Sequence, residues 1–533
     1  MSILIKNGTV VNCESIIKGD VLIENGIITA VGTNVKCPDG NVRVIDASGR
    51  YIMPGGIDPH THLQSSFMGV ETADDFFTGS KAALAGGTTM LIDLAIPEKD
   101  DSIIETYKKW RSMADSKVCC DYGLSVALTT WNPKTCSDME TLTKPEYGIN
   151  SFKFFLAFSG TYMVDDGQFY QGLRRCSELG ALAKVHAENG HVIKARQEEL
   201  LKKGITGPEG HIQSRPEALE EEATDRACIL ASHANCPLYV ANVMSKGALR
   251  AMVRQRHRGK LVFGETVAAA LVLDGSHYFD KDWYHAASYV RSPPFSLDKK
   301  TPSVLVDSLA SGQLHLVGSD HCTYNRKQRE IGANDFTRIP NGTNGIEERL
   351  SVVWETGVRC GRIDPMQFVS ITSANAAKFH NIYPRKGCIA VGSDADIIIW
   401  DGSATRTISV KTHHQASDMN IFEGMQLHGV CVMTILHGII VYENGHLSVE
   451  AGNGKFIPLP VNSPYCFATI DVREKQRMPK IVHREGDLPY ESSSTESLRL
   501  GRKRSNSMTA TASTSTSTSS SIKSYLSSYR HAE

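Results

Sequence analysis

The sequence lacks several features that would place it in a common class of protein. No stretch approaches the ~20 consecutive apolar residues that a membrane-spanning helix requires. The N-terminal apolar run is broken by Lys6 and Asn7, too early for a secretory signal. Charges nearly balance, with 57 Lys and Arg against 58 Asp and Glu, so no global field favours nucleic acid or anionic lipid. We therefore expect a cytoplasmic protein that binds neither nucleic acid nor membrane.

Signatures of several catalytic classes are also missing. The 13 cysteines include no C-x-x-C pair, which argues against a zinc ribbon or a disulfide framework and favours free, mostly buried thiols. No G-x-G-x-x-G follows an expected strand, so a dinucleotide site is not expected. Neither a G-x-S-x-G elbow nor a catalytic Cys/His signature is present, which disfavours nucleophilic serine and cysteine chemistry.

Both ends of the chain carry β-type sequence. Near the N-terminus, ILIK and TVVN flank Asn7-Gly8, and DVLIE and IITAVG flank Asn25-Gly26, which predicts two hairpins. The same pattern of β-type runs occurs again in IAVGSDADIIIWD (389–401) and in MTILHGIIVYE, which is followed by Asn444-Gly445. We predict that residues 1–52 and 377–460 together form one small β-sandwich domain.

Residues 53–376 alternate short apolar runs with stretches of helical periodicity. Repeated strand and helix units predict a parallel sheet of the α/β class. The strand entering IDPHTHL and seven further runs make eight strands, which suit a closed (β/α)₈ barrel better than a doubly wound sheet. The seven runs are TTMLIDLA (88–95), YGLSVALT (122–129), SFKFFLAF (151–158), LAKVHAE (182–188), PLYVANV (237–243), KLVFGE (260–265) and LHLVGSD (314–320).

The C-terminal residues differ from the rest of the chain. Residues 461–490 have an extended, polar pattern and are interpreted as a C-terminal extension. Residues 491–533 are rich in Ser and Thr, as in TATASTSTSTSSS, and cannot bury enough apolar surface to offset the entropy of ordering. We predict a disordered tail over 491–533.

Metal-competent side chains stand where the apolar runs end, and in a β/α barrel those ends carry the active site. His60 and His62 form H-x-H, and residues i and i+2 of a strand face the same side. His186 ends one run and Asp320 ends another. Each has an ordinary structural explanation when taken alone, but the set with Lys153 predicts a metal site.

Lys153 is the least expected member of this set. It lies between Phe152 and Phe154 in a barrel strand, where burying an ammonium group costs several kcal/mol unless it is neutral or paired. A neutral amine can react with carbon dioxide to give a carbamate, which is able to bridge two metal ions. Pairing with an aspartate, or extension of the side chain to the barrel rim, is the alternative.

The motifs DPHTHL, GINSFKFFLAF, KVHAENG, SRPEALEEEAT, VRSPPF, GSDHCTYN, IPNGTNGIEER and KGCIAVGSDADIIIWD occur in this order. This order resembles the dihydropyrimidinase/hydantoinase branch of the amidohydrolase superfamily, with animal dihydropyrimidinases and the related collapsin response mediator proteins most similar. The resemblance covers about residues 3–460. It implies a (β/α)₈ barrel with a β-sandwich, a homotetramer, and contact of residues 461–490 with a neighbouring subunit.

The resemblance also implies a mechanism. Two zinc ions, bridged by carbamylated Lys153 and a hydroxide, would open the ring of 5,6-dihydrouracil or dihydrothymine to give an N-carbamoyl-β-amino acid. Asp320 would carry the proton to the leaving nitrogen. By motif, His60, His62 and Asp320 would hold the first zinc, His186 the second, and Ser292 and Asn341 the cyclic imide through backbone groups.

Two positions depart from this pattern. Asn242 replaces the histidine that completes the second zinc site, and an amide oxygen suits hard cations better than zinc, so the second ion should bind weakly. Phe158 replaces a tyrosine that donates a hydrogen bond to the oxyanion, and loss of one such donor costs about 10²–10³ in rate. Tyr162 would substitute only if its loop turns toward the metals.

Three functions remain open at the level of sequence. A zinc-dependent dihydropyrimidinase with reduced activity is favoured by the retained ligand set. A catalytically inactive scaffold or signalling protein is favoured by Asn242, Phe158 and the Ser-rich tail. A hydrolase of another cyclic amide, such as a hydantoin, is favoured by the changed residue near the substrate carbonyl.

Overall fold

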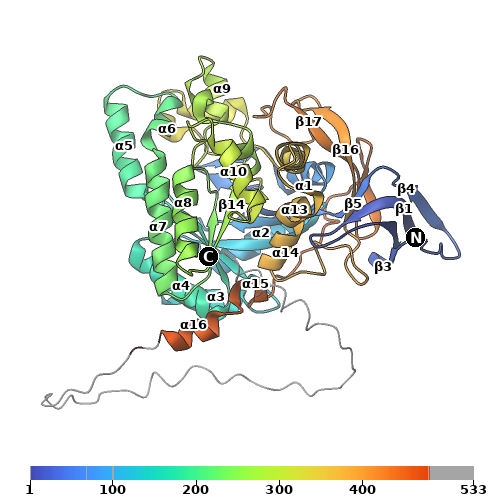
Figure 1. Ribbon diagram of the computed structural model, residues 1–533. Coiled ribbons are helices and arrows are strands. Elements are labelled where there is room, and N and C mark those ends of the chain that lie inside the picture. The colour runs from blue at the N-terminus through green and yellow to red at the C-terminus, as the bar shows by residue number, and fades with distance from the viewer. Residues whose placement is uncertain (1, 68, 99–100, 478, 480–533) are drawn as a thin grey trace, which may run out of the picture. The chain divides into compact units, whose positions relative to one another are not determined.

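The computed structural model describes residues 2–67, 69–98, 101–477 and 479. Its centre is an eight-stranded parallel sheet in the order β15-β14-β13-β12-β11-β10-β9-β6. Each of the eight predicted strands is present, and the predicted (β/α)₈ barrel is confirmed (Figure 1). The barrel strands are β6 (Gly56–Thr61), β9 (Thr88–Ala95), β10 (Asp121–Leu128), β11 (Ser151–Phe155), β12 (Leu182–His186), β13 (Leu238–Ala241), β14 (Val262–Val267) and β15 (Leu316–Gly318).

Backbone hydrogen bonds close the barrel between its first and last strands. His62 N donates to His321 O at 3.0 Å, and Asp320 N donates to His60 O at 3.0 Å. These bonds join the segment that follows β15 to the end of β6. The closure therefore sets His60, His62 and Asp320 next to one another.

Helices connect the strands and cover the barrel. In α4, Asp165 caps the first turn by accepting from Gln168 N, and the helix ends at Gly180, whose φ of 68° a glycine adopts without strain. Phe169, Leu173 and Cys176 form the buried stripe of this helix. The helices are α1 (Phe76–Ala85), α2 (Ile103–Asp115), α3 (Pro133–Leu142), α4 (Asp166–Leu179), α5 (Gly190–Lys202), α6 (Glu209–Ser214), α7 (Glu217–His233), α8 (Lys246–His257), α9 (Trp283–Ser288), α10 (Thr301–Ala310), α11 (Arg326–Arg329), α12 (Arg349–Val353), α13 (Pro365–Val369) and α14 (Asn375–Phe379).

A second sheet combines both ends of the chain, as predicted. Its order is β19-β18-β17-β16-β5-β1-β2-β3, with β4 paired to β1, and the antiparallel β5–β16 pair joins the two segments (Figure 1). Residues including Ile5, Val21, Ile397 and Ile435 form its own core. The strands are β1 (Ser2–Val11), β2 (Ile16–Glu24), β3 (Ile27–Gly32), β4 (Val42–Asp46), β5 (Tyr51–Pro54), β16 (Ile397–Thr407), β17 (Gln426–Leu436), β18 (Ile439–Glu443) and β19 (His446–Leu447), and a separate pair joins β7 (Ser66–Phe67) to β8 (Val70–Glu71).

One predicted hairpin is wrong. Asn25-Gly26 turns between β2 and β3 with φ values of 52° and 79°, as a tight turn with two left-handed residues requires. Asn7 has a φ of 63°, but Gly8 is not left-handed, and β1 continues through both residues with only a shift in register. A single left-handed residue makes a bulge rather than a reversal. The predicted turn at Asn444-Gly445 connects β18 to β19.

The predicted domain limits at 52/53 and 376/377 fall inside β5 and α14, and the described residues up to Arg477 form one compact unit. The polar segment after residue 460 is not simply extended, since it forms α15 (Pro464–Phe467) and α16 (Ile470–Gln476). Cys466 is buried beside barrel residues such as Leu182. The predicted tail over 491–533 lies outside the described residues.

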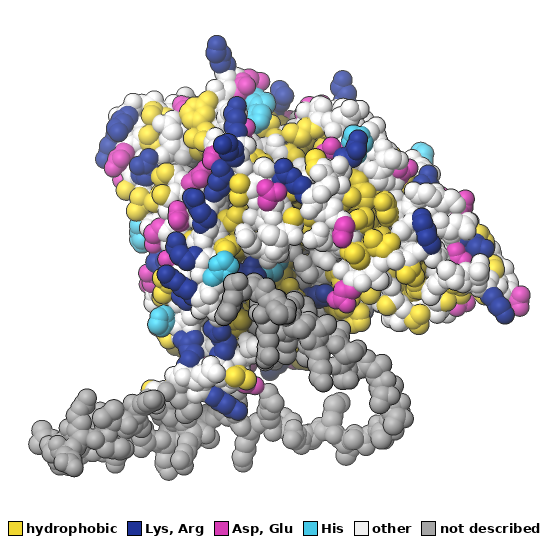
Figure 2. Space-filling view, in the orientation of Figure 1, with side chains coloured by type: hydrophobic (Ala, Val, Ile, Leu, Met, Phe, Trp, Pro, Cys, Tyr) yellow, Lys and Arg dark blue, Asp and Glu magenta, His cyan; other side chains and the backbone are white. Residues whose placement is uncertain are grey.

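Within the described part of the chain, no helix is both long and apolar enough to cross a membrane. On the face shown in Figure 2, side chains of Lys and Arg lie among those of Asp and Glu, which agrees with a formal net charge of −1. All thirteen cysteines are free, and most are buried, as the absence of C-x-x-C led us to expect.

Candidate metal centre

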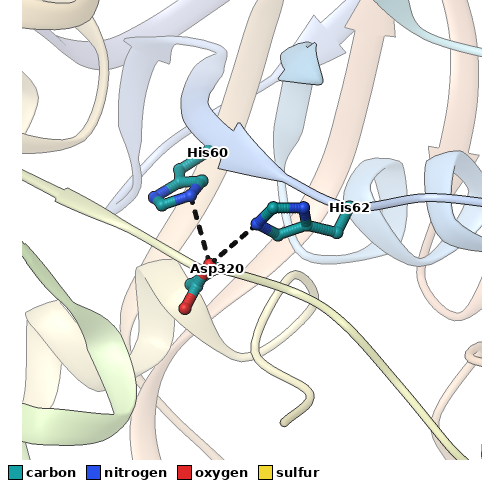
Figure 3. Close-up of side chains that lie close together, drawn as sticks. All are labelled: His60, His62 and Asp320. Carbon is teal, nitrogen blue, oxygen red and sulfur yellow. Dashed lines mark ion pairs between the residues drawn. The ribbon is translucent and has the colours of Figure 1, made fainter. Parts of the chain in front are cut away.

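Three of the predicted ligands meet at the carboxyl end of the barrel (Figure 3). Asp320 Oδ1 lies 3.2 Å from His60 Nε2 and 3.3 Å from His62 Nε2. Both imidazoles point at the same carboxylate oxygen, as the alternation of a strand predicts for H-x-H. Asp320 adopts a left-handed φ of 50°, which aspartate tolerates better than most residues. The three side chains are close enough to hold one ion.

Buried partners fix the orientation of His60. Its Nδ1 lies 2.8 Å from Glu265 Oε1, and Tyr239 OH donates to Glu265 Oε2 at 2.5 Å. Burial raises the pKa of Glu265, but the charge of His60 and these hydrogen bonds more than offset that effect and lower it. An ionised carboxylate only accepts hydrogen bonds, so Nδ1 carries the hydrogen and Nε2 keeps its lone pair. This is the arrangement typical of a histidine that binds a metal.

Lys153 lies beside this cluster. Its Nζ is 2.5 Å from His60 Nε2, and the residue is 2% exposed. Burial lowers the pKa of Lys153 to about 8, although the charges of Asp320 and Glu265 act in the opposite direction. Part of the population therefore carries a neutral amine near neutral pH, and only the neutral amine reacts with carbon dioxide.

His186 lines the same pocket as Lys153 and Asp320 but lies apart from the His60, His62 and Asp320 cluster. Its Nε2 is 2.7 Å from Glu188 Oε2, which also accepts from Arg215 Nη1 at 2.9 Å. Burial raises the pKa of Glu188, but the charge of Arg215 and the His186 hydrogen bond hold it at about 2. His186 therefore donates through Nε2 and keeps the lone pair of Nδ1.

The other oxygen of Asp320 is occupied by two donors. Asn242 Nδ2 donates to Asp320 Oδ2 at 3.0 Å, and Arg291 Nη2 donates to the same oxygen at 2.5 Å. Burial alone would raise the pKa of Asp320, but His60, His62 and Arg291 hold it well below its usual range. Asp320 is therefore ionised and shared between two groups of partners.

The predicted substrate residues line the same pocket. Ser292 Oγ donates to Asn341 Oδ1 at 2.7 Å, which brings the two together. Phe158 lies in this pocket with a left-handed φ of 61°, and its ring centroid is 5.3 Å from that of His186. Tyr162 also lines the pocket, and its ring centroid is 6.1 Å from that of Phe158. The tyrosine considered as a substitute donor is thus near the candidate ligands.

The residues fit a divalent ion at the first position better than at the second. At the first position, His60 and His62 present Nε2 to an ionised carboxylate, with Lys153 adjacent. At the second position, His186 has a lone pair available, but Asn242 directs its amide nitrogen at Asp320, since only that atom can donate to a carboxylate. The buried Asn242 Oδ1 has no hydrogen-bond partner among the described residues.

Sequence reasoning missed the groups that support the ligands. Glu265, Tyr239 and Glu188 lie within or at the end of apolar runs, and for the two glutamates a charge in such a run was the available signal. Arg291 lies in VRSPPF, directly before the predicted residue Ser292, but nothing in the sequence indicated that it reaches Asp320. That contact depends on the closure of the barrel.

Comparisons with known proteins agree with the fold and identify the family. The pattern of the amidohydrolase family matches residues 51–441. Dihydropyrimidinase 1 of Caenorhabditis briggsae is 56% identical over 90% of this chain and 99% of its own length. Dihydropyrimidinase-related protein 5 of Homo sapiens is 46% identical over 94% of this chain and 88% of its own length.

Among solved structures, dihydropyrimidinase from Brevibacillus agri matches with a TM-score of 0.84 and 42% identity, covering 86% of this chain and 99% of that one. The chain therefore belongs to the amidohydrolase family, within the group of dihydropyrimidinases, hydantoinases and their relatives. The resemblance seen in the sequence motifs is confirmed.

Proposed function

We propose that this protein is a zinc-dependent cyclic amidohydrolase that opens the ring of 5,6-dihydrouracil or dihydrothymine. The observation that carries the proposal is the convergence of His60 and His62 on Asp320 at the carboxyl end of the barrel, with Lys153 beside His60. A bound divalent ion supplies Lewis acidity, which activates water and polarises the ring carbonyl. His60, His62 and Asp320 would hold it, with carbamylated Lys153 beside them and His186 at the second position.

The protein's own groups supply the proton transfer. Hydrolysis places the OH of water on the ring carbonyl carbon, breaks the C–N bond and puts a proton on the nitrogen. Asp320 lines the pocket, and as the resemblance implies, it would take the proton from water and deliver it to the leaving nitrogen. Ser292 and Asn341, held together at 2.7 Å, orient the imide.

A turnover assay tests this proposal directly. The full chain, supplied with zinc and bicarbonate, should convert dihydrouracil to N-carbamoyl-β-alanine, and Asp320→Asn should reduce conversion to background. As a matched control, Asp298→Asn changes an aspartate on the surface that pairs with Lys246, and it should leave turnover unchanged. Conversion at background in the unmodified chain, with zinc bound, would refute the proposal.

A second candidate is a catalytically inactive scaffold or signalling protein. It is favoured by the engagement of Asp320 Oδ2 by Arg291 and Asn242, and by the phenylalanine at position 158. Asn242→His combined with Phe158→Tyr separates the two functions. If the unmodified chain has only background turnover and the double variant turns over several orders of magnitude faster, then Asn242 and Phe158 are the cause of the inactivity, and the second candidate is supported.

A third candidate is a hydrolase of another cyclic amide. Solved D-hydantoinases share this fold with a TM-score of 0.84 and 40% identity in one case, which favours a five-membered hydantoin ring as a substrate. A panel of dihydropyrimidines, hydantoins and cyclic imides would compare kcat/KM between rings. Turnover of dihydropyrimidines alone would remove this candidate.

A further inference from the structure

The side chain of Arg291 places a positive charge inside the candidate metal centre. Its Nη2 donates to Asp320 Oδ2 at 2.5 Å, and the arginine side chain is 1% exposed. Asn242 Nδ2 donates to the same oxygen at 3.0 Å. Because both groups contact one atom, the guanidinium lies beside the amide that stands in the position of a metal-binding histidine.

The structure holds Arg291 in this position from several sides. Its Nη1 lies 2.9 Å from Met244 Sδ, and its Cζ lies 5.5 Å from the centroid of the Phe295 ring. His211 Nε2 lies 2.7 Å from the Arg291 backbone oxygen, which anchors the main chain at this point. The guanidinium group therefore brings a fixed positive charge to the site.

This arrangement leaves the second position short of metal ligands, although His186 keeps the lone pair of its Nδ1. The amide of Asn242 is turned toward Asp320, and its remaining carbonyl oxygen is a poor zinc ligand. A dication at the second position would also lie close to the guanidinium in a site shielded from solvent, where like charges repel strongly. The carboxylate of Asp320 is also already paired with a positive charge, because its Oδ2 accepts from Arg291.

We infer that this chain holds a single metal ion, bound by His60, His62 and Asp320, and that Arg291 with Asn242 takes the place of the second. The inference deepens the proposed function and rests on it for the identity of the ion. Arg291 acts as a positioning residue: it fixes Oδ2 of Asp320, so that Oδ1 faces the two histidines.

Metal stoichiometry tests the inference without reference to turnover. The full chain is saturated with zinc in bicarbonate, freed of unbound metal, and measured for zinc and protein concentration. The unmodified chain should hold one zinc, and Arg291→Met combined with Asn242→His should hold two. Arg291→Lys combined with Asn242→His is the matched control, because it restores the histidine but keeps a positive charge, and it should still hold one.

Two zinc ions in the unmodified chain would overturn the inference, as would two in the lysine control. A thermal melt identifies any variant that fails to fold. Crystals of the unmodified chain provide a second test that needs no substitution. Anomalous scattering at the zinc edge should give one peak beside His60 and His62, and a second peak beside His186 would contradict the inference.

The same samples distinguish this inference from the proposed function. One zinc with no hydrolysis of any cyclic amide refutes the proposed function and supports the inference. Hydrolysis with two zinc ions refutes the inference and supports the proposed function.

Discussion

Nδ1 of His60 lies 2.8 Å from Oε1 of Glu265 inside the barrel. The second oxygen of Glu265 accepts from Tyr239 OH, so both carboxylate oxygens have assigned donors and the imidazole is held with Nε2 toward Asp320. The orientation of the first candidate ligand on β6 is therefore set by β13 and β14. Neither of these strands supplies a ligand expected for the first ion.

This support predicts an effect on metal affinity. Glu265→Gln keeps the volume of the side chain but removes its charge, and loss of such a partner typically weakens metal binding by about 10–100-fold. Competition with a zinc chelator measures the affinity. Tyr239→Phe leaves the carboxylate in place and should cause a smaller loss, so an equal loss in both variants would contradict the assigned role of Glu265.

Lys153 predicts a dependence on carbon dioxide. The side chain is buried beside His60, and burial lowers its pKa to about 8, so a neutral amine is available to form a carbamate. We expect turnover to fall in carbon dioxide-free buffer and to recover when bicarbonate is added. Lys153→Ala should abolish turnover under both conditions.

Lys184 provides the control for this experiment. It is also buried in the barrel, but its Nζ contacts Ser125 Oγ at 3.0 Å and the Pro59 backbone oxygen at 3.4 Å. Lys184→Met should keep the dependence on bicarbonate. If turnover of the unmodified chain does not depend on bicarbonate, Lys153 acts without a carbamate.

The barrel could be predicted because most of its buried parallel strands lie in short, mainly apolar runs, and these runs end at chemically distinct residues. His60, His62 and Asp320 were predictable from those ends. Arg291 was not, because its contact with Asp320 arises only when the strands close into a ring. Asn7 shows the same limit on a local scale, since a turn and a bulge share the Asn-Gly signal and differ only in the φ of Gly8.

We expect Tyr162 to donate a hydrogen bond to the oxyanion in place of the hydroxyl that Phe158 lacks. It lines the pocket with Lys153 and Asp320, and burial raises its pKa to about 12, so its hydroxyl remains protonated over the working range of pH. If this hydroxyl replaces the one absent from Phe158, Tyr162→Phe should lower kcat by about 10²–10³ with little change in KM.

Tyr170→Phe is a suitable control for that measurement, because Tyr170 is exposed on α4. It should leave kcat unchanged. An unchanged kcat in Tyr162→Phe would instead exclude Tyr162 as the donor and leave the oxyanion without a tyrosine partner from this loop.

The buried carboxyl of Glu220 should make the free energy of unfolding fall as pH rises. This carboxyl is 6% exposed, and its Oε1 accepts from Met244 N at 2.8 Å. Burial raises its pKa to about 8, and the charges of Glu188 and Glu217 add to the rise. The folded chain therefore binds a proton that the unfolded chain releases near pH 4.5. The contribution to stability is complete below that pH and is lost as pH rises through 8.

Glu220→Gln keeps the oxygen that accepts from Met244 N and removes the titration. Its free energy of unfolding should match that of the unmodified chain near pH 4 and exceed it by roughly 4 kcal/mol at pH 8.5. Denaturant unfolding at both pH values measures this difference, and effects common to both proteins cancel. Glu198→Gln changes an exposed glutamate on α5 and should show the same difference at both pH values. If Glu220→Gln also gives the same difference at both pH values, the buried carboxyl is not the source of the pH dependence.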